Sequence, residues 1–547
     1  MKKIFVCLLI NSAIFFVCVA QENKTDRSFE LSKNLEIFSS VYKTLYTTYV
    51  DDIKEGELVK TAIDAMLMKL DPYTNYYPES DLEDVKMQLL GEYGGIGALI
   101  MQKGDSVYIS EPYEGLPAYE AGLKAGDLIL EVNGQNALGK TSDQVREILR
   151  GQAGSTISMK IKRFDKEKSF TFKRKEITLP NLPYSGVIGE DIGYIKLNEF
   201  TKNAANNVLS AFNNLKKQDI KGLIIDLRGN GGGLLNEAVD IVNIFVDKGQ
   251  VVVYTKGKTQ DKNQTFRTMR KAIDDSMPIV VLIDGVSASA SEIVAGSLQD
   301  IDRAVIMGQR SFGKGLVQNV VPLVYNTQMK VTVSKYYIPS GRCIQAIDYS
   351  HRDSTGRANK ITDSLRTAFK TKHGRTVYDG YGIEPDIATQ AEYYSSILFS
   401  LVSKNLIFDY ATNFANKHAS IPPAKDFNIT EEIYNDFVSF LKDKDYSYTS
   451  PTEYSLREFA EIAKKDKCNE NILSQIYNIK LQIEEDKRND LYKFKNEISE
   501  VLLSEIVVRY YNQKGRVEAY INHDTEVKQA IDLLHDKPNY DSILRVK

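Results

Sequence analysis

The sequence predicts an α/β domain in the middle of the chain, with helical segments before and after it. Between residues 176 and 390, short apolar runs alternate with stretches whose apolar residues recur at helical spacing, as expected when strands are joined by helices. The runs that we interpret as strands are residues 193–197, 222–227, 251–254, 279–283, 304–307 and 330–337. Residues 29 to 70 and the chain from residue 392 onward are patterned as helices instead.

Length and charge bound the possible classes of protein. A chain of 547 residues is long for one domain and suggests three or four. The formal net charge is −3, and it becomes −5 if residues 1 to 20 are removed, because these contain two lysines and no acids. Since nucleic-acid binding depends on clustered positive charge, this balance argues against a nucleic-acid partner.

The first 20 residues have the features of a signal peptide. Two lysines precede an apolar run from Ile4 to Val19, and small residues end at Ala20. We predict cleavage after Ala20 and a mature protein in the periplasm or otherwise outside the cytoplasm. An uncleaved membrane anchor and a lipoprotein signal at Cys18 are the alternatives, although the run is short for a membrane span and no small residue precedes Cys18.

Two cysteines, Cys343 and Cys468, follow the signal. They are 125 residues apart, and we interpret them as unpaired thiols rather than as a disulfide. Neither their spacing nor the positions of the histidines indicate a metal site. The sequence indicates no cofactor.

Residues 84 to 175 change to short strands separated by glycine turns. EYGGIGALI at 92–100 is followed by PAYEAGLKAGDLILEVNG at 117–134 and by a short amphipathic helix at 143–149. This order resembles a PDZ domain, which binds a peptide as an added strand and holds its terminal carboxylate with backbone N–H groups. The resemblance implies that the peptide pairs with residues 98–100. It also assigns carboxylate binding to a loop of four residues, Gly94, Gly95, Ile96 and Gly97. The alternative is a glycine turn that only closes a hairpin.

The stretch that says most about chemistry is residues 284 to 318. A predicted strand leads into a turn made only of Ser and Ala, SASAS at 287–291, and then into a helix. A serine at such a junction is suited to be a nucleophile, because the helix N-terminus offers free N–H groups to a developing oxyanion.

A serine nucleophile needs a base, and histidine is scarce here. Only His351 and His373 lie near this region, in a polar stretch without a strand end or a glycine turn. Lys314 lies in a Gly-Lys-Gly loop after the next strand, and burial can lower the pKa of a lysine from about 10.4 towards neutrality. We therefore predict that Lys314 is the general base.

A glycine run at residues 231–233 stands at a second junction between a strand and a helix. Glycines leave backbone N–H groups unobstructed, as an oxyanion site requires. The alternative, a phosphate-binding loop, lacks both the Gly-Lys-Ser/Thr ending and the Gly-x-Gly-x-x-Gly spacing.

Together these motifs resemble the C-terminal processing (tail-specific) peptidases, secreted serine proteases with a Ser–Lys dyad. The resemblance rests on SASASEI, the GKG-x-x-Q block, DLRGNGGGLL, and further blocks at 70–77, 336–345 and 380–387. It covers about residues 30 to 390. It implies an α/β core of the Clp-protease/crotonase-like type, with an inserted PDZ domain and helical N- and C-terminal segments.

The resemblance also implies roles for individual residues. Ser289 matches the nucleophile, Lys314 the general base and Gln318 the residue that orients the lysine. Asp300 matches an acidic residue of supporting role. The oxyanion hole would be formed by the N–H of Ala290 and by the N–H of a second residue, either Gly232 or Gly233.

The implied function is a serine endopeptidase that recognises the C-termini of protein or peptide substrates through its PDZ domain. The alternatives are a peptide-binding scaffold without catalysis and an acyl-CoA enzyme of the crotonase type. We predict five segments: a signal peptide, an N-terminal helical segment, the PDZ domain, the peptidase core and a C-terminal helical domain, at residues 1–20, 21–83, 84–175, 176–390 and 391–547.

Two parts of the chain carry no catalytic motif. Residues 346–378 are rich in charged and hydroxyl side chains, and we expect an exposed insertion there. The C-terminal domain carries two apolar stripes, which we expect to bury against neighbouring helices or a partner. A homo-oligomer joined through this domain is one role open to it. The stripes consist of Ile472, Ile476, Ile479 and Ile483, and of Ile498, Leu502 and Ile506.

Overall fold

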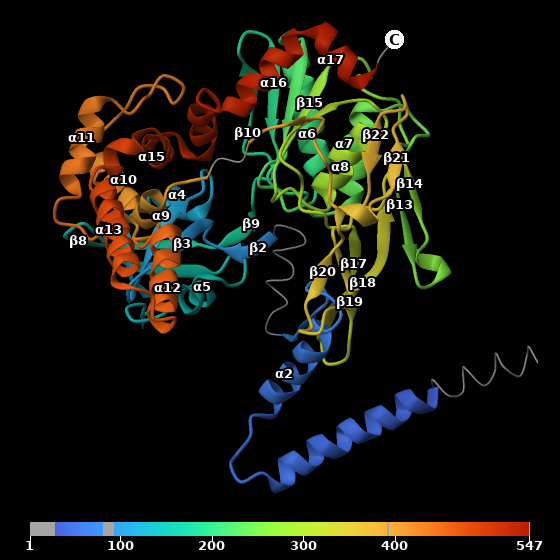
Figure 1. Ribbon diagram of the computed structural model, residues 1–547, viewed down its shortest axis with the longest axis horizontal. Coiled ribbons are helices and arrows are strands. Elements are labelled where there is room, and N and C mark those ends of the chain that lie inside the picture. The colour runs from blue at the N-terminus through green and yellow to red at the C-terminus, as the bar shows by residue number, and fades with distance from the viewer. Residues whose placement is uncertain (1–27, 80–91, 391–392, 546–547) are drawn as a thin grey trace, which may run out of the picture.

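The computed structural model describes residues 28–79, 92–390 and 393–545 (Figure 1). The predicted signal peptide and the first residues of the predicted PDZ segment, 84–91, lie outside the described residues. Figure 1 shows the α/β core beside a second body, in which the PDZ domain and the C-terminal helices lie together. Among the helices in the described ranges, none combines the length and the apolar character needed to cross a membrane.

The core is built on a six-stranded sheet that is parallel except at one edge. An antiparallel pair forms that edge, and each following strand pairs in parallel with its neighbour. Every residue of the three central strands is buried, as expected for a parallel sheet covered on both faces. The order is β10 (Tyr184–Ile188), β11 (Ile192–Lys196), β12 (Gly222–Asp226), β15 (Ile279–Ile283), β16 (Val305–Gly308) and β23 (Ile387–Ala388).

Helices cover both faces of this sheet. Ile225 points into one apolar cluster and Ile224 into another, because successive side chains of a strand face opposite ways. The first face is covered by α6 (Ala204–Lys216), α7 (Leu235–Phe245) and α8 (Ala290–Asp300). The second face is covered by the last two helices of the chain, α16 (Thr525–His535) and α17 (Lys537–Leu544). The predicted boundary at residue 391 groups this pair with the C-terminal domain, whereas the structure makes it a layer of the core.

A second sheet stands beside the first and includes part of the N-terminal segment. The chain begins with a helix at 28–48 and α2 (Glu55–Met68), which extend away from the core in Figure 1. The strand that follows them, β1, pairs with the start of β18. The sheet consists of β1 (Asn75–Tyr77), β18 (Gln328–Tyr337), β13 (Val251–Gly257), β14 (Thr265–Arg267) and, on β18, β17 (Leu316–Pro322).

All six predicted core strands are confirmed to within two residues at each end, apart from β13, which runs three residues further. The predicted exposed insertion is wrong in its second half. There, Arg375 is buried and pairs with Asp302 and Asp386, because its guanidinium needs partners once it is covered. The segment forms two hairpins, β19 (Ile347–Arg352) with β20 (Ala358–Lys360) and β21 (Ala368–Lys370) with β22 (Thr376–Tyr378).

The PDZ domain is an antiparallel sheet with a helix along its open edge. A two-stranded stem, β2 (Glu92–Gly95) with β9 (Lys175–Thr178), stands where the chain enters and leaves the domain. The helix α5 (Ser142–Leu149) begins with a capping box formed by Thr141 and Gln144. The sheet order is β3 (Ala98–Lys103), β4 (Ser106–Pro112), β5 (Leu128–Val132), β7 (Thr156–Arg163) and β8 (Lys166–Lys173), with β6 (Gln135–Asn136) on β5 and α4 (Pro117–Glu120) after β4.

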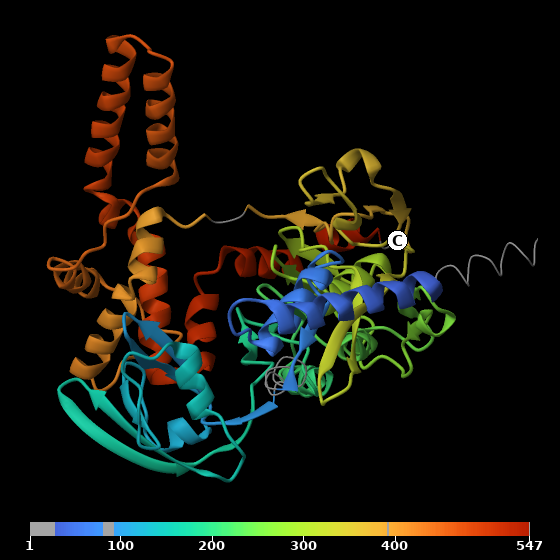
Figure 2. The same ribbon diagram turned by 90° about the horizontal axis from the view of Figure 1, so that it is seen from below.

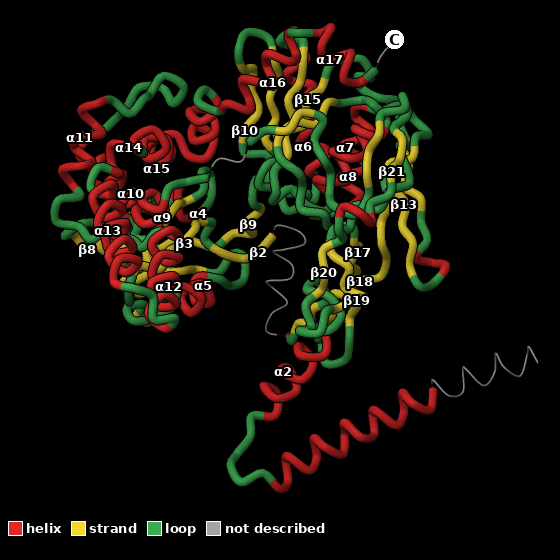
Figure 3. Tube along the Cα trace, in the orientation of Figure 1, coloured by secondary structure: helices red, strands yellow, loops and turns green. Residues whose placement is uncertain are grey.

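The described chain after β23 is helical (Figure 3). One apolar cluster joins α9 (Ser396–Ser403), α10 (Leu406–Lys417), α11 (Glu431–Phe440), α14 (Asp490–Lys493) and α15 (Lys495–Ile521). The predicted stripe on α15, which begins at Ile498, is fully buried. The pair α12 (Pro451–Lys465) and α13 (Glu470–Lys487) extends away as a hairpin (Figure 2). In its stripe, Ile472 and Ile479 are exposed, because no described helix covers this side of the hairpin, and their burial against a partner stays a prediction.

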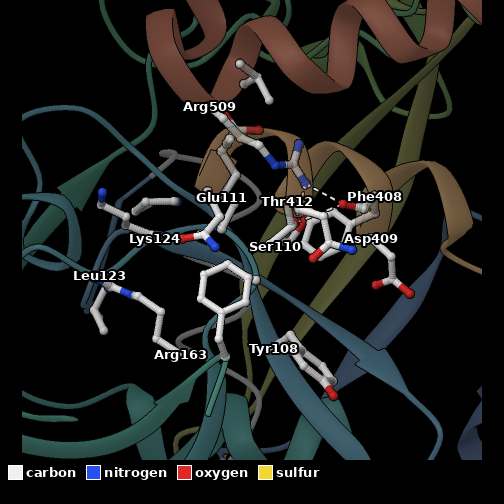
Figure 4. A pocket seen from close by; sticks show the side chains of 18 of the residues that line it. Tyr108, Ser110, Glu111, Leu123, Lys124, Arg163, Phe408, Asp409, Thr412 and Arg509 are labelled. Atoms are coloured by element: carbon white, nitrogen blue, oxygen red, sulfur yellow. Dashed lines mark hydrogen bonds between the residues drawn. The ribbon is translucent and has the colours of Figure 1, made fainter. Parts of the chain in front are cut away.

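A cavity of about 890 Å³ separates the PDZ domain from α10 and α15 (Figure 4). Its walls are mixed, with Tyr108 and Phe408 beside charged groups such as Glu111 and Arg509. None of the predicted catalytic residues lines it, so it is not the catalytic site.

Candidate active site

Ser289 lies in the tight turn between β15 and α8. Its φ is +56°, a left-handed backbone conformation that is uncommon outside glycine and is often found at functional sites. The two neighbouring serines are fully buried and attach this turn to the glycine loop. The Ser287 hydroxyl donates to the Leu227 carbonyl at 2.8 Å, and the Ser291 hydroxyl donates to the Asn230 carbonyl at 2.9 Å. Ser289 is half-buried, and its hydroxyl takes no part in this attachment to the described loop.

Glu292 joins the turn of Ser289 to the loop of Lys314. Its fully buried carboxylate accepts hydrogen bonds from the N–H of Ser289 at 2.8 Å and from the N–H of Lys314 at 2.9 Å. It also accepts from the Gly313 N–H at 2.7 Å and from the Ser311 hydroxyl at 2.5 Å. Burial raises the pKa of this carboxyl, although the four donors oppose the shift. Sequence analysis missed Glu292; its place three residues after Ser289 was the available signal.

The glycine loop lies directly against the predicted nucleophile. A Cβ atom added to Gly232 would lie 2.8 Å from the Cβ of Ser289 and 3.0 Å from the nitrogen of Ala290. Glycine is favoured at this position for two reasons: a side chain has no space there, and the φ of +100° strains other residues. The structure therefore brings Gly232, Ser289 and Ala290 together.

The two glycines differ in what their N–H groups do. The Gly232 N–H donates to the Asn230 side chain at 2.9 Å, so it is already engaged. Within the described residues, the N–H groups of Gly233 and Ala290 have no hydrogen-bond acceptor. Of the two glycines that sequence analysis left open, Gly233 is thus the one with a free donor.

Lys314 is partly buried at the start of the segment that leads into β17. Its Nζ lies 4.4 Å from the centre of the Tyr73 ring. Burial, with a smaller contribution from Lys330, lowers the pKa of Lys314 to about 8, against the opposing charges of Glu292 and Asp71. A lysine with this pKa is neutral, as a general base must be, in about a tenth of molecules at pH 7 and in about half of them at pH 8.

Tyr73 comes from the turn that connects α2 to β1, so the N-terminal segment contributes to the site. Asp71 fixes this turn by accepting from the N–H groups of Tyr73 at 2.8 Å and Thr74 at 2.9 Å. The Tyr73 ring packs edge-on against Tyr349, with 6.1 Å between ring centroids. Sequence analysis used residues 70–77 only as one of the blocks that carry the family resemblance, and it missed Tyr73.

Gln318 and Asp300 form hydrogen bonds with residues other than Ser289 and Lys314. The Gln318 amide donates to the Thr332 hydroxyl at 3.2 Å rather than bonding to Lys314. Asp300 ends α8, about 16 Å along the helix from Ser289. Its carboxylate accepts from Arg342 at 2.8 Å and from the Ser340 N–H at 2.9 Å, so it fixes the loop after β18.

Of the predicted carboxylate-binding loop, Gly94 and Gly95 end β2 and pair with β9, while Ile96 and Gly97 lie in the turn before β3, the edge strand of the PDZ sheet. The Ile96 carbonyl accepts from the Ala118 N–H at 2.8 Å, and the Gly97 carbonyl accepts from the Tyr113 N–H at 3.0 Å. In the described chain, the N–H groups of Ile96 and Gly97 have no acceptor. Within the described ranges β3 pairs only with β4, and its other edge lies next to α5, where a PDZ domain takes an added strand.

Comparison with known proteins matches four family models along the chain. They are the activating protease CtpB N-terminal domain at residues 16–80, the PDZ domain at 108–163, peptidase family S41 at 191–350, and the C-terminal helical domain of a probable PDZ-protease at 397–534. A carboxy-terminal-processing protease of Bartonella bacilliformis is 35% identical over 355 residues, which are 62% of this chain and 81% of the relative.

The chain belongs to the carboxy-terminal-processing protease family. It is therefore a serine-type peptidase, and the predicted fold class is confirmed: a peptidase core of family S41, a PDZ domain, and helical segments at both ends. A probable CtpA-like serine protease of Staphylococcus epidermidis is 33% identical over 341 residues, covering 62% of this chain and 69% of the relative. The solved photosystem II D1 C-terminal processing protease is 26% identical, with 64% of this chain and 92% of that chain covered and a TM-score of 0.34.

Proposed function

We propose that this carboxy-terminal-processing protease is an endopeptidase whose reaction is performed by Ser289 and Lys314. The observation that carries the proposal is the Glu292 carboxylate, which holds the N–H groups of both residues and so fixes the turn of the nucleophile against the loop of the base. The depressed pKa of Lys314, about 8, supports its role as the base.

In the proposed reaction, neutral Lys314 takes the hydroxyl proton while the Ser289 oxygen attacks the peptide carbonyl carbon. The N–H groups of Ala290 and Gly233 donate to the oxyanion, each contributing about 3 kcal/mol by comparison with other serine proteases. The protonated lysine then gives its proton to the departing amine, and an acyl-enzyme remains. Lys314 then takes a proton from water as the water oxygen attacks this ester, and it returns that proton to the Ser289 oxygen as the ester bond breaks and the new carboxyl end is released. Gln318 would orient the lysine after its amide leaves Thr332.

The test of this reaction uses single substitutions and a disordered reporter protein with an apolar C-terminus. Ser289→Ala and Lys314→Ala should each lower cleavage by at least about 1000-fold without changing the thermal melting temperature. Ser210→Ala and Lys217→Ala are matched controls and should cleave normally. Ser210 is exposed on α6, and Lys217 is exposed directly after this helix. Full activity in Lys314→Ala would refute the dyad. A scaffold without catalysis would show no cleavage in the wild type.

The PDZ domain is proposed to hold the substrate by its C-terminus. The free N–H groups of Ile96 and Gly97 and the unpaired edge of β3 support this proposal. Two reporters that differ only in a free or an amidated terminal carboxyl provide the test. Amidation should raise KM and leave kcat nearly unchanged if the domain tethers the substrate, whereas a fall in kcat as well would indicate that occupancy also activates the core. Equal kinetics for both reporters would contradict carboxylate recognition.

Location and assembly are also proposals. The lysines and the apolar run at residues 1–20 support export from the cytoplasm, which N-terminal sequencing of protein from cell fractions would test by finding Gln21 first.

Exposed Tyr454, Phe459 and Ile462 on α12 support contact between copies through the helical hairpin. Sedimentation of the full chain, with these three residues replaced by serine as the comparison, would test that contact.

A further inference from the structure

The last helices of the chain are tied to the core by an ion-pair cluster as well as by apolar packing. Asp524 caps α16: one carboxylate oxygen accepts from the N–H groups of Glu526 and Val527. Its other oxygen accepts from Arg228 at 2.7 Å, and Glu526 accepts from the same guanidinium at 2.6 Å. Arg228 and Asp524 are 296 residues apart in sequence.

Arg228 is held from the core side too. Asp226, buried at the end of β12, accepts from its Nη2 at 2.7 Å and from its Nε at 3.1 Å. The Arg228 carbonyl accepts from Lys196 at 2.6 Å. One guanidinium thus bridges three carboxylates, two of which belong to the C-terminal segment. Its fixed, planar set of donors suits this bridging, which a lysine could not reproduce.

The ion-pair cluster is connected to the active site through Arg228, because the glycine loop begins at the next residue. The Gly229 N–H donates to Asp284 at 2.9 Å. The Asn230 carbonyl accepts from the Ala288 N–H at 3.1 Å and from the Ser291 hydroxyl. Gly232 then lies against Ser289. The loop is also held by the segment after β11, since the Phe200 N–H donates to the Gly232 carbonyl at 3.0 Å and the Asn230 side chain donates to the Leu197 carbonyl at 2.9 Å. Its contacts across the site are to the nucleophile turn, and the start of the loop is fixed by Arg228.

We propose that Arg228, held by Asp524 and Glu526, is a positioning residue that sets the glycine loop at the distance from Ser289 that oxyanion binding requires. The C-terminal segment 522–545 therefore contributes to the geometry of the active site in the peptidase core. The inference rests on the proposed function, since it concerns the oxyanion site of that reaction. Transition-state binding depends on donor positions to a fraction of an ångström, whereas binding of the substrate tail to the PDZ domain does not.

The test is the double variant Asp524→Asn with Glu526→Gln in the full chain. Asparagine retains the helix cap, so the change removes charge and leaves α16 able to form. We expect kcat to fall about 10-fold to 100-fold with KM changed less than twofold, by comparison with the about 100-fold to 1000-fold loss of a whole oxyanion donor. The affinity of a peptide aldehyde, which forms a tetrahedral adduct with the serine, should weaken in parallel with kcat/KM. Asp532→Asn, on the exposed side of the same helix, is the matched control and should change neither quantity.

Hydrogen exchange of the loop amides 229–233 provides a readout that needs no activity. Exchange there should speed up at least tenfold in the double variant and stay unchanged in Asp532→Asn. Wild-type protein that cleaves nothing would refute the proposed function. Faster exchange of the loop in the double variant would still support the positioning role of Arg228. A folded double variant with kcat and loop exchange within twofold of wild type would overturn the inference. If the double variant does not fold, Glu526→Gln alone takes its place, with about half the effect on a logarithmic scale.

Discussion

The two halves of the catalytic site are built in different ways. On the nucleophile side, Ser289 is fixed by the sheet, by the serines on either side and by a glycine loop that touches it. On the base side, no described residue hydrogen-bonds to the Nζ of Lys314, and the group is surrounded by the Tyr73 ring, Lys330 and Asp71. The nucleophile is therefore positioned by contacts, whereas the base is tuned by its surroundings, partly from the N-terminal segment.

Outside the proposed Ser289–Lys314 pair, the largest effect should come from Glu292, which both halves share. One Glu292 oxygen accepts from the N–H groups of Ser289 and Lys314, and the other accepts from the Gly313 N–H and the Ser311 hydroxyl, so the amide NH₂ of Glu292→Gln leaves at least one buried N–H without an acceptor in either orientation. We expect kcat/KM to fall about 1000-fold and the free energy of unfolding to fall by about 3 kcal/mol. Kinetics and denaturant titration measure both quantities.

Glu237→Gln is the control for this substitution. Glu237 also accepts from two backbone N–H groups, at the start of α6, but it is only half-buried and lies outside the site. In the Glu237→Gln variant, the free energy of unfolding should fall by about 1 kcal/mol and kcat/KM should stay unchanged. Equal activity losses in the two variants would mean that Glu292 acts only through general stability.

The next effect tests the nucleophile half alone. Gly232→Ala places a methyl group 2.8 Å from Ser289 and forces alanine to a φ of +100°. We expect about a 100-fold fall in kcat, because the turn or the loop must move away from the oxyanion position. Gly231→Ala, one residue earlier in open space, should retain activity to within about threefold. If both alanine variants are equally active, the loop does not touch the nucleophile as the structure has it.

A smaller effect tests the base half. Tyr73→Ala opens the Lys314 ammonium to water; burial is the largest cause of its low pKa, so the pKa should rise. Loss of the ring's attraction for the ammonium works in the opposite direction but is worth only about 1 kcal/mol. We expect the acid limb of kcat/KM to move up by about one pH unit, which costs several-fold at pH 7 and little at pH 10. Tyr73→Phe keeps the ring and should leave the limb in place. A downward shift in Tyr73→Ala would show that the ring stabilises the ammonium more than it shields it.

The sequence predicted the nucleophile half better than the base half, for a physical reason. Strands and the turns between them are local patterns, so the core strands and the Ser289 turn could be placed by apolar periodicity and small residues. Tyr73 approaches Lys314 across 241 positions of chain, and Arg228 meets Asp524 across 296. Such contacts depend on how the elements assemble, which periodicity does not contain. The same limit explains why the burial of Arg375 was missed.

The central claim is that neutral Lys314 removes the proton from Ser289, and the pH dependence of kcat/KM tests it most directly. With the free carboxyl reporter between pH 6 and pH 10, the account predicts a rate that rises with pH to a plateau, with an apparent pKa of about 8. The rise follows because the base works only when deprotonated. An apparent pKa near 6.5, as a histidine base would give, or a rate independent of pH across this range, would contradict it.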